Sequence, residues 1–157
     1  MCLIVDANVA HTFDFPPHDD AVPILKWLLN PHSFAMLVVG GDLTDELLRS
    51  GEPIRNLLTQ LNRAGRLRIV DRKILDIEQE KVKTLLKADG IDKKMNDPHI
   101  IAIARVSGSR LLFSRDSKSL LHEIFKTRKY LKPPGKIYQT REHAELLRSS
   151  PKCKPIK

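Results

Sequence analysis

No apolar run in the sequence approaches the ~20 residues that a membrane-spanning helix needs, and the first residues lack the basic lead of a signal peptide. The two cysteines, Cys2 and Cys153, lie at opposite ends of the chain, so they indicate neither a disulfide framework nor a zinc cluster. Aromatic residues make up only 5%, which argues against a stacking platform that binds single strands without cutting them. We therefore expect a cytoplasmic protein with reduced cysteines and no membrane association.

Several common functional motifs are also missing. The sequence has no Walker phosphate loop and no GxGxxG motif, and its six histidines show no metal-ligand spacing. The segment Asp6-Ala7-Asn8 lacks the second aspartate expected of a haloacid-dehalogenase phosphatase. Carboxylates are therefore the strongest candidate functional groups that remain.

The amino-acid composition is typical of one soluble, basic domain. Of 157 residues, 41% are hydrophobic and 29% charged, which is enough apolar material for a core. Lys and Arg number 27 against 19 Asp and Glu, giving a net charge of +8. Such an excess favours a polyanionic partner. We expect a folded domain over residues 1–149 and a basic, flexible tail over 150–157.

Short apolar runs alternate with helical patterns along the chain. Strands are predicted at 2–5, 34–39, 67–70, 111–113 and 136–138, with helices at 21–29, 42–50, 53–63, 74–88, 98–107, 120–125 and 141–147. Apolar runs without alternation are typical of parallel strands covered on both faces. The sequence therefore predicts an α/β fold, a three-layer α/β/α sandwich with a central parallel sheet of about five strands.

Four acidic residues are predicted to meet at one edge of this sheet. Asp6 and Asp116 end the first and fourth strands, Asp97 opens the helix that leads into the fourth strand, and Glu46 lies in the helix after the second. Ligands of parallel sheets bind at the carboxyl ends of the strands. Because crowded carboxylates repel one another, we expect a cation among them. A site whose ligands are all oxygens favours Mg²⁺ or Mn²⁺.

Each of these acids also has a simpler interpretation. Asp97, directly before Pro98, is a good helix N-cap, and Asp116 could cap the next helix. Glu46 could be a solvated helix residue. A purely structural role is hardest to assign to Asp6, because a carboxylate that follows a buried strand needs a partner.

Four segments carrying these acids resemble the PIN-domain nucleases, especially the VapC-type toxin ribonucleases. They are LIVDANV at 3–9, LTDEL at 43–47, NDPHIIAIA at 96–104 and LLFSRD at 111–116. The resemblance spans residues 2 to about 125. It implies that Asp6, Glu46, Asp97 and Asp116 form the family's acidic quartet, which binds divalent metal and activates water, and that Ser114 is its polar residue before the last aspartate. Lys118 stands where many relatives carry a further acid, so the match does not extend to a complete second metal site.

These observations lead to a functional hypothesis. The protein is expected to be a metal-dependent endoribonuclease in which Asp6, Asp97 and Asp116 hold Mg²⁺ or Mn²⁺ and Glu46 orients or deprotonates the water. The residues expected to contact RNA are Asn8, Ser114, Arg115 and Lys118. The resemblance further implies either a toxin held by an antitoxin or an RNA-processing enzyme. The alternative, motivated by Lys118, is a catalytically silent module on the same fold that binds nucleic acid or a protein partner.

A homodimer is also predicted. The helices at 21–29 and 53–63 are expected to carry more apolar residues than one core needs, namely Trp27, Leu28, Leu57, Leu58 and Leu61. Relatives in the resembled family commonly pair into homodimers.

Overall fold

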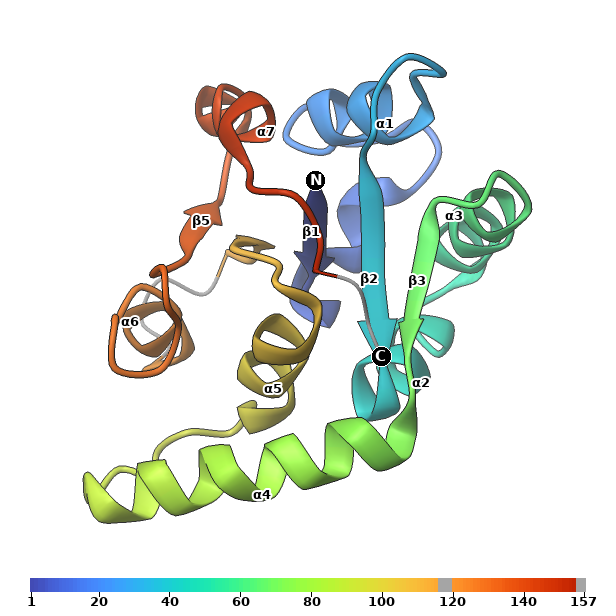
Figure 1. Ribbon diagram of the computed structural model, residues 1–157. Helices are drawn as coiled ribbons and strands as arrows, with labels where there is room; N and C mark the ends of the chain where they lie inside the picture. Colours follow the sequence, from blue (N-terminus) through green and yellow to red (C-terminus); the bar gives the residue numbers. More distant parts are fainter. Residues whose placement is uncertain (116–119, 155–157) are drawn as a thin grey trace.

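The computed structural model describes residues 1–115 and 120–154, and it contains a five-stranded sheet with helices on its two faces (Figure 1). All strand pairings are parallel, in the order β3-β2-β1-β4-β5. The strands are β1 (Cys2–Val5), β2 (Met36–Gly40), β3 (Leu67–Val70), β4 (Leu111–Phe113) and β5 (Lys136–Tyr138). The predicted α/β sandwich with a parallel sheet is confirmed.

The helices agree with the sequence prediction in number and order over most of the chain. They are η1 (Ala7–Phe13), α1 (Val22–Leu29), α2 (Gly41–Leu48), α3 (Glu52–Arg63), α4 (Arg72–Ala88), α5 (Pro98–Ser107), α6 (Leu120–Phe125), η2 (Arg141–His143) and α7 (Leu146–Ser149). The 3₁₀ helix η1 was not predicted, and the helix predicted at 141–147 is split into η2 and α7. Among the described residues, no helix is long and apolar enough to cross a membrane.

Helix starts were the least accurate part of the prediction, because caps depend on local backbone geometry. Helix α4 begins earlier than its apolar pattern, since the Asp71 side chain accepts hydrogen bonds from the backbone N–H groups of Lys73 and Ile74. Helix α2 begins at Gly41, one residue before its predicted start, with no side-chain cap. Gly41 has φ +51, a conformation that favours glycine.

Strand β1 forms the centre of the fold. All four of its side chains are buried, and it pairs with β2 on one side and β4 on the other. The chain runs from β1 outward to β2 and β3, then crosses back through α4 and α5 to β4 on the opposite side of β1. The strand order therefore reverses between β1 and β4. In open parallel sheets, ligands bind outside the carboxyl ends of the strands at such a switch point.

The C-terminal segment, predicted to be a flexible tail, lies against the domain as far as the structure describes it. The backbone N–H of Lys154 donates to the Ser107 carbonyl at 2.8 Å, and Arg68 donates to the Lys154 carbonyl. Cys153 forms a disulfide with Cys2, with the two Cα atoms 5.4 Å apart. The expectation of reduced cysteines is therefore wrong for this pair, because its partners are 151 residues apart in sequence and only folding brings them together.

The apolar surface invoked for a homodimer is not free. Leu28, Leu57, Leu58 and Leu61 are buried within a single chain, and Trp27 is half-buried against the same core. The four leucines belong to the same hydrophobic cluster as the strand residues, and Trp27 packs against that cluster. The inference of surplus apolar residues was therefore wrong, and the homodimer stays a prediction that rests on the resemblance alone.

The disulfide leads to a stability prediction. We expect Cys153→Ser to lower the free energy of unfolding by about 2–4 kcal/mol, because closing so long a loop restricts the unfolded chain. Thermal melts without reductant measure the difference. With dithiothreitol, the wild type should fall to the level of the variant. A wild-type melting temperature that reductant leaves unchanged would contradict a stabilising Cys2–Cys153 bond.

Candidate functional site

Asp6 lies at the switch point, directly after β1, and it is buried with an exposed fraction of 8%. It is the N-cap of η1, and its Oδ1 atom accepts a long hydrogen bond of 3.5 Å from the backbone N–H of Asn8. Its Oδ2 atom accepts a hydrogen bond of 3.1 Å from the Ser114 hydroxyl at the end of β4. The two neighbouring strands thus hold one carboxylate between them.

Ser114 is the centre of a buried polar network. Its Oγ atom lies 2.8 Å from His122 Nε2 on α6 and 3.4 Å from Asn8 Nδ2. A hydroxyl has one proton to donate and two lone pairs to accept with. When Ser114 donates to Asp6, its oxygen can accept from Asn8 Nδ2, and it can accept from His122 only if that ring carries its proton on Nε2. Asn8 and Ser114, which are expected to contact substrate, thus also belong to the hydrogen-bond network around Asp6.

Asp97 lies at the N-terminus of α5, where the sequence allowed a capping role. It occupies the N-cap position, but its side chain makes no capping hydrogen bond. Its negative charge instead acts on Asp6. Burial, together with the Asp97 charge, raises the pKa of Asp6 above its usual range, against the hydrogen bond from Ser114. The negative charge of Asp97 therefore acts at the switch point, where it disfavours ionisation of Asp6.

Glu46 on α2 completes the group of interacting acids, and it is paired with a histidine. Its Oε1 atom lies 3.7 Å from His99 Nε2 on α5. His99 is buried, with an exposed fraction of 5%, and within the described part of the chain its Nε2 atom has no hydrogen-bond partner. Burial raises the pKa of Glu46, as do the charges of Asp97 and Asp6, while His99 opposes the rise.

The described acids are chemically suited to a divalent cation, but by themselves they do not form a complete set of metal ligands. Asp6, Glu46 and Asp97 offer hard oxygen ligands, which Mg²⁺ and Mn²⁺ prefer. Over residues 1–115 and 120–154, however, no three His, Cys, Asp or Glu side chains are grouped closely enough to hold a metal ion. The predicted ligand Asp116 and the predicted substrate contact Lys118 lie outside the described residues.

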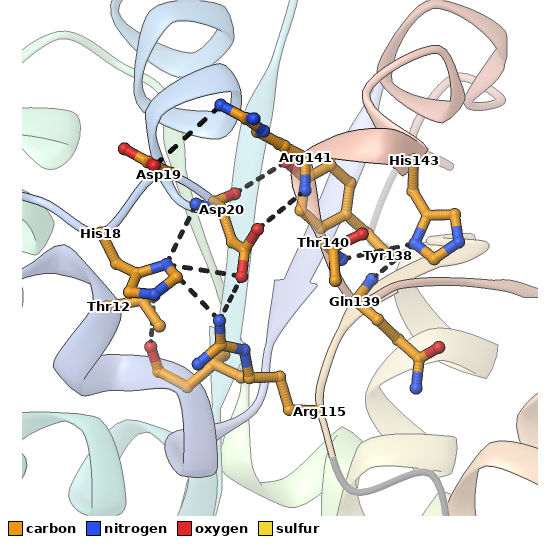
Figure 2. A network of polar contacts seen from close by, with 11 residues as sticks. Thr12, His18, Asp19, Asp20, Arg115, Tyr138, Gln139, Thr140, Arg141 and His143 are labelled. Atoms are coloured by element: carbon orange, nitrogen blue, oxygen red, sulfur yellow. Dashed lines mark hydrogen bonds and ion pairs between the residues drawn. The ribbon is translucent and has the colours of Figure 1, made fainter.

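Arg115, expected to contact substrate, is engaged in a second polar network, which Figure 2 shows. Its guanidinium donates to the Asp20 carboxylate and lies 3.4 Å from His18 Nδ1. Asp20 also accepts from the Arg141 backbone N–H at 3.0 Å. In Figure 2 these groups come from the segment before α1, the end of β4 and the segment after β5.

This second network fixes the chain on the β5 side of the switch point. The Tyr138 hydroxyl donates to the Asp20 carbonyl at 2.7 Å, and burial with the Asp20 charge raises the pKa of Tyr138 to about 12. Burial also opposes ionisation of Asp20, but the hydrogen bonds from Arg141 and Arg115 outweigh it, so the pKa of Asp20 lies below its ordinary value. Arg115 is thereby held at the end of β4, next to the acidic site.

Several residues of these networks were not predicted from the sequence, among them Asp20, His99 and His122. His122 and Ser114 are eight residues apart in sequence, but Asp20 and Arg115 are 95 apart, and no local pattern connects them. His99 lies two residues after Asp97 on the same helix, which was the one available sign of its place. Comparison of the chain with protein-family models, curated proteins and solved structures returns no match.

The Asp20 network predicts a pH-dependent loss of stability. A carboxyl whose pKa is depressed by folding contributes stability above its ordinary pKa of 3.8, and this contribution is lost as the pH falls through the folded value. Asp20→Asn should therefore lower the free energy of unfolding at pH 7 by about 1–3 kcal/mol. The deficit should shrink in melts recorded at successively lower pH below 3.8.

The matched control for this prediction is Asp19→Asn. The Asp19 side chain is 79% exposed and lies 4.0 Å from Arg141 Nη1, so its removal should change stability little at any pH. A deficit in Asp20→Asn that stays constant from pH 7 to pH 3 would contradict the ionic contribution of Asp20.

Proposed function

We propose that the protein is a metal-dependent endoribonuclease of the PIN type, acting at the acidic edge between β1 and β4. The observation that carries this proposal is the mutual effect of Asp6, Glu46 and Asp97. These acids come from distant parts of the sequence, and the pKa values of Asp6 and Glu46 are raised by burial and by the neighbouring carboxylates. Perturbed carboxylates gathered at a switch point are typical of functional sites.

In this proposal the acids have separate roles. Asp6 and Asp97, with Asp116, would hold Mg²⁺ or Mn²⁺. When bound, such a cation supplies charge neutralisation for the carboxylates and polarises a phosphate oxygen and water. Glu46 takes a proton from the attacking water, a task for which a raised pKa is favourable. His99, 3.7 Å away, faces the same carboxylate and restricts where it points.

The charge of the chain supports RNA as the substrate. The net charge is +8 although four acids are assigned to the site, so the remaining surface is strongly basic. Lys93 and Lys94 are exposed just before Asp97. The PIN resemblance adds the expectation of RNA cleavage in the cytoplasm, where Cys2 and Cys153 would be exposed to reductants. It also suggests an antitoxin partner, while stand-alone RNA processing remains the other form of this proposal.

The direct test is cleavage of a panel of RNAs by the folded protein with Mg²⁺ or Mn²⁺, compared with the same reaction in EDTA. Metal-dependent cleavage at defined positions is expected. A folded protein that cuts no RNA with either metal would contradict the proposal.

A catalytically silent binding module is the second candidate, and one observation favours it: Lys118 stands where many relatives of the resembled family carry a further acid. Titration with Mn²⁺ followed by thermal melts separates the two candidates. The nuclease should be stabilised by metal. The silent module should show no stabilisation and should still bind RNA with a steep dependence on salt.

The strongest single test is substitution of Asp97. Replacing a capping aspartate by Ala lowers the free energy of unfolding by about 1 kcal/mol, whereas replacing it by Asn changes stability very little. Because the Asp97 side chain makes no capping bond, we expect both variants to melt at or above the wild-type temperature without metal. Both should lose most of the Mn²⁺-induced stabilisation and cut RNA roughly a hundredfold or more slowly than wild type.

Asp92→Asn is the matched control, because Asp92 is exposed and lies in the same loop before α5. It should keep wild-type cleavage and metal response. Near-normal cleavage by Asp97→Asn would remove Asp97 from the metal site. A loss of stability confined to Asp97→Ala would instead restore the capping interpretation.

A further inference from the structure

A basic cavity lies at the opposite end of α5 from the acidic site. Its volume is about 340 Å³, and it lies between α4, the end of α5, the segment after α6 and the C-terminal segment. Five of its lining residues are basic and one is acidic: Arg105, Arg110, Lys129, Lys132, Lys154 and Glu78. Since α5 rises about 1.5 Å per residue, roughly 15 Å of helix separates this cavity from Asp97.

Arg110 is the most constrained of these basic groups. It is buried, with an exposed fraction of 6%. Its guanidinium donates to the carbonyls of Ala104 at 2.7 Å, Ser109 at 2.8 Å and Lys132 at 3.2 Å, while Nε has no partner among the described residues. Carbonyls satisfy the N–H groups without neutralising the charge. A buried cation with no counter-charge is unfavourable, and burial together with Arg105 lowers the pKa of Arg110.

The nearby acids are already committed to other cations. Glu78 accepts from Arg105 Nε at 2.6 Å and lies 3.7 Å from Lys81 Nζ. Asp89 pairs with Lys129 and also accepts from the Tyr130 hydroxyl. In the part of the chain that the structure describes, Arg110, Lys132 and Lys154 have no carboxylate partner. Within residues 1–115 and 120–154, the cavity therefore holds an excess of positive charge without matching carboxylates.

Hydrogen bonds of its backbone hold the C-terminal segment at the cavity. The hydrogen bond from Lys154 N–H to the Ser107 carbonyl and the one from Arg68 to the Lys154 carbonyl fix this residue at the end of α5. The Cys2–Cys153 disulfide fastens the preceding residue. A lysine from the end of the chain is thus held at the cavity, although its side chain is exposed and has no described ion pair.

We propose that this cavity is a binding site for a compact phosphate-bearing anion, the class to which pyrophosphate and the diphosphate group of a nucleotide belong. Three uncompensated cations around a concave space favour a ligand with several charges close together. An extended strand would place one phosphate here and the rest outside. The site is separate from the acidic edge, so this proposal does not depend on nuclease activity.

The test is calorimetric titration of the full chain with pyrophosphate, in EDTA so that no metal at the acidic edge contributes. The double variant Lys132→Gln/Lys154→Gln removes two cations whose side chains are exposed, so the fold should persist, as circular dichroism can check. We expect pyrophosphate affinity to fall roughly tenfold or more, equivalent to about 1.4 kcal/mol per tenfold. The control Lys26→Gln/Lys73→Gln changes net charge equally at exposed positions away from the cavity and should bind as wild type.

A second titration with a short single-stranded RNA identifies the source of the phosphate. Binding of pyrophosphate that is weakened only by the cavity variant supports a free oligophosphate or nucleotide ligand. Binding of RNA without pyrophosphate binding, weakened in the same way, would overturn the compact anion in favour of a nucleic-acid phosphodiester. If the cavity variant and the control bind both probes equally, or if wild type binds neither at millimolar concentration, the proposal is overturned.

Discussion

The burial of β1 on both faces and both edges is the constraint on which the rest of the molecule depends. Strand β1 is paired with β2 and β4 and covered by helices, so it ends inside the protein. Asp6, the residue that follows it, is therefore buried. A carboxylate there needs donors or a cation. Ser114 supplies one donor from the neighbouring strand, and Asn8 supplies a longer one. Asp97 and Glu46 add charge of the same sign, which raises the need for a cation further.

Helix α5 connects two regions of opposite charge. Asp97 stands at its N-terminal end, and Arg105 and Arg110 lie at and beyond its C-terminal end. The peptide dipoles of a helix favour acids at the first end and cations at the second. The acidic edge and the basic cavity are therefore each placed where the helix stabilises their charge. Because α5 is almost wholly buried, it also fixes the separation of the two regions.

Much of the fold could be predicted from sequence because its strands are short, fully buried apolar runs. The strands at 2–5, 67–70, 111–113 and 136–138 have the predicted bounds. The convergence of Asp6 and Asp97 on one edge could also be expected, since carboxyl ends of parallel strands share an edge. The contacts of their side chains could not. The pairing of Arg115 with Asp20 is one such contact, and nothing local in the sequence indicates it.

The sequence by itself determined the α/β class, the parallel sheet and the acids at the strand ends, because apolar periodicity and residue type act over a few neighbouring positions. Only the tertiary structure decided which polar groups meet: Ser114 with His122, Glu46 with His99, and Cys2 with Cys153. It also showed that Leu57 and Leu61 belong to the core rather than to a free surface. The physical reason is that hydrogen bonds, ion pairs and burial depend on distances between residues far apart in the chain, and those distances exist only after the strands have taken their order.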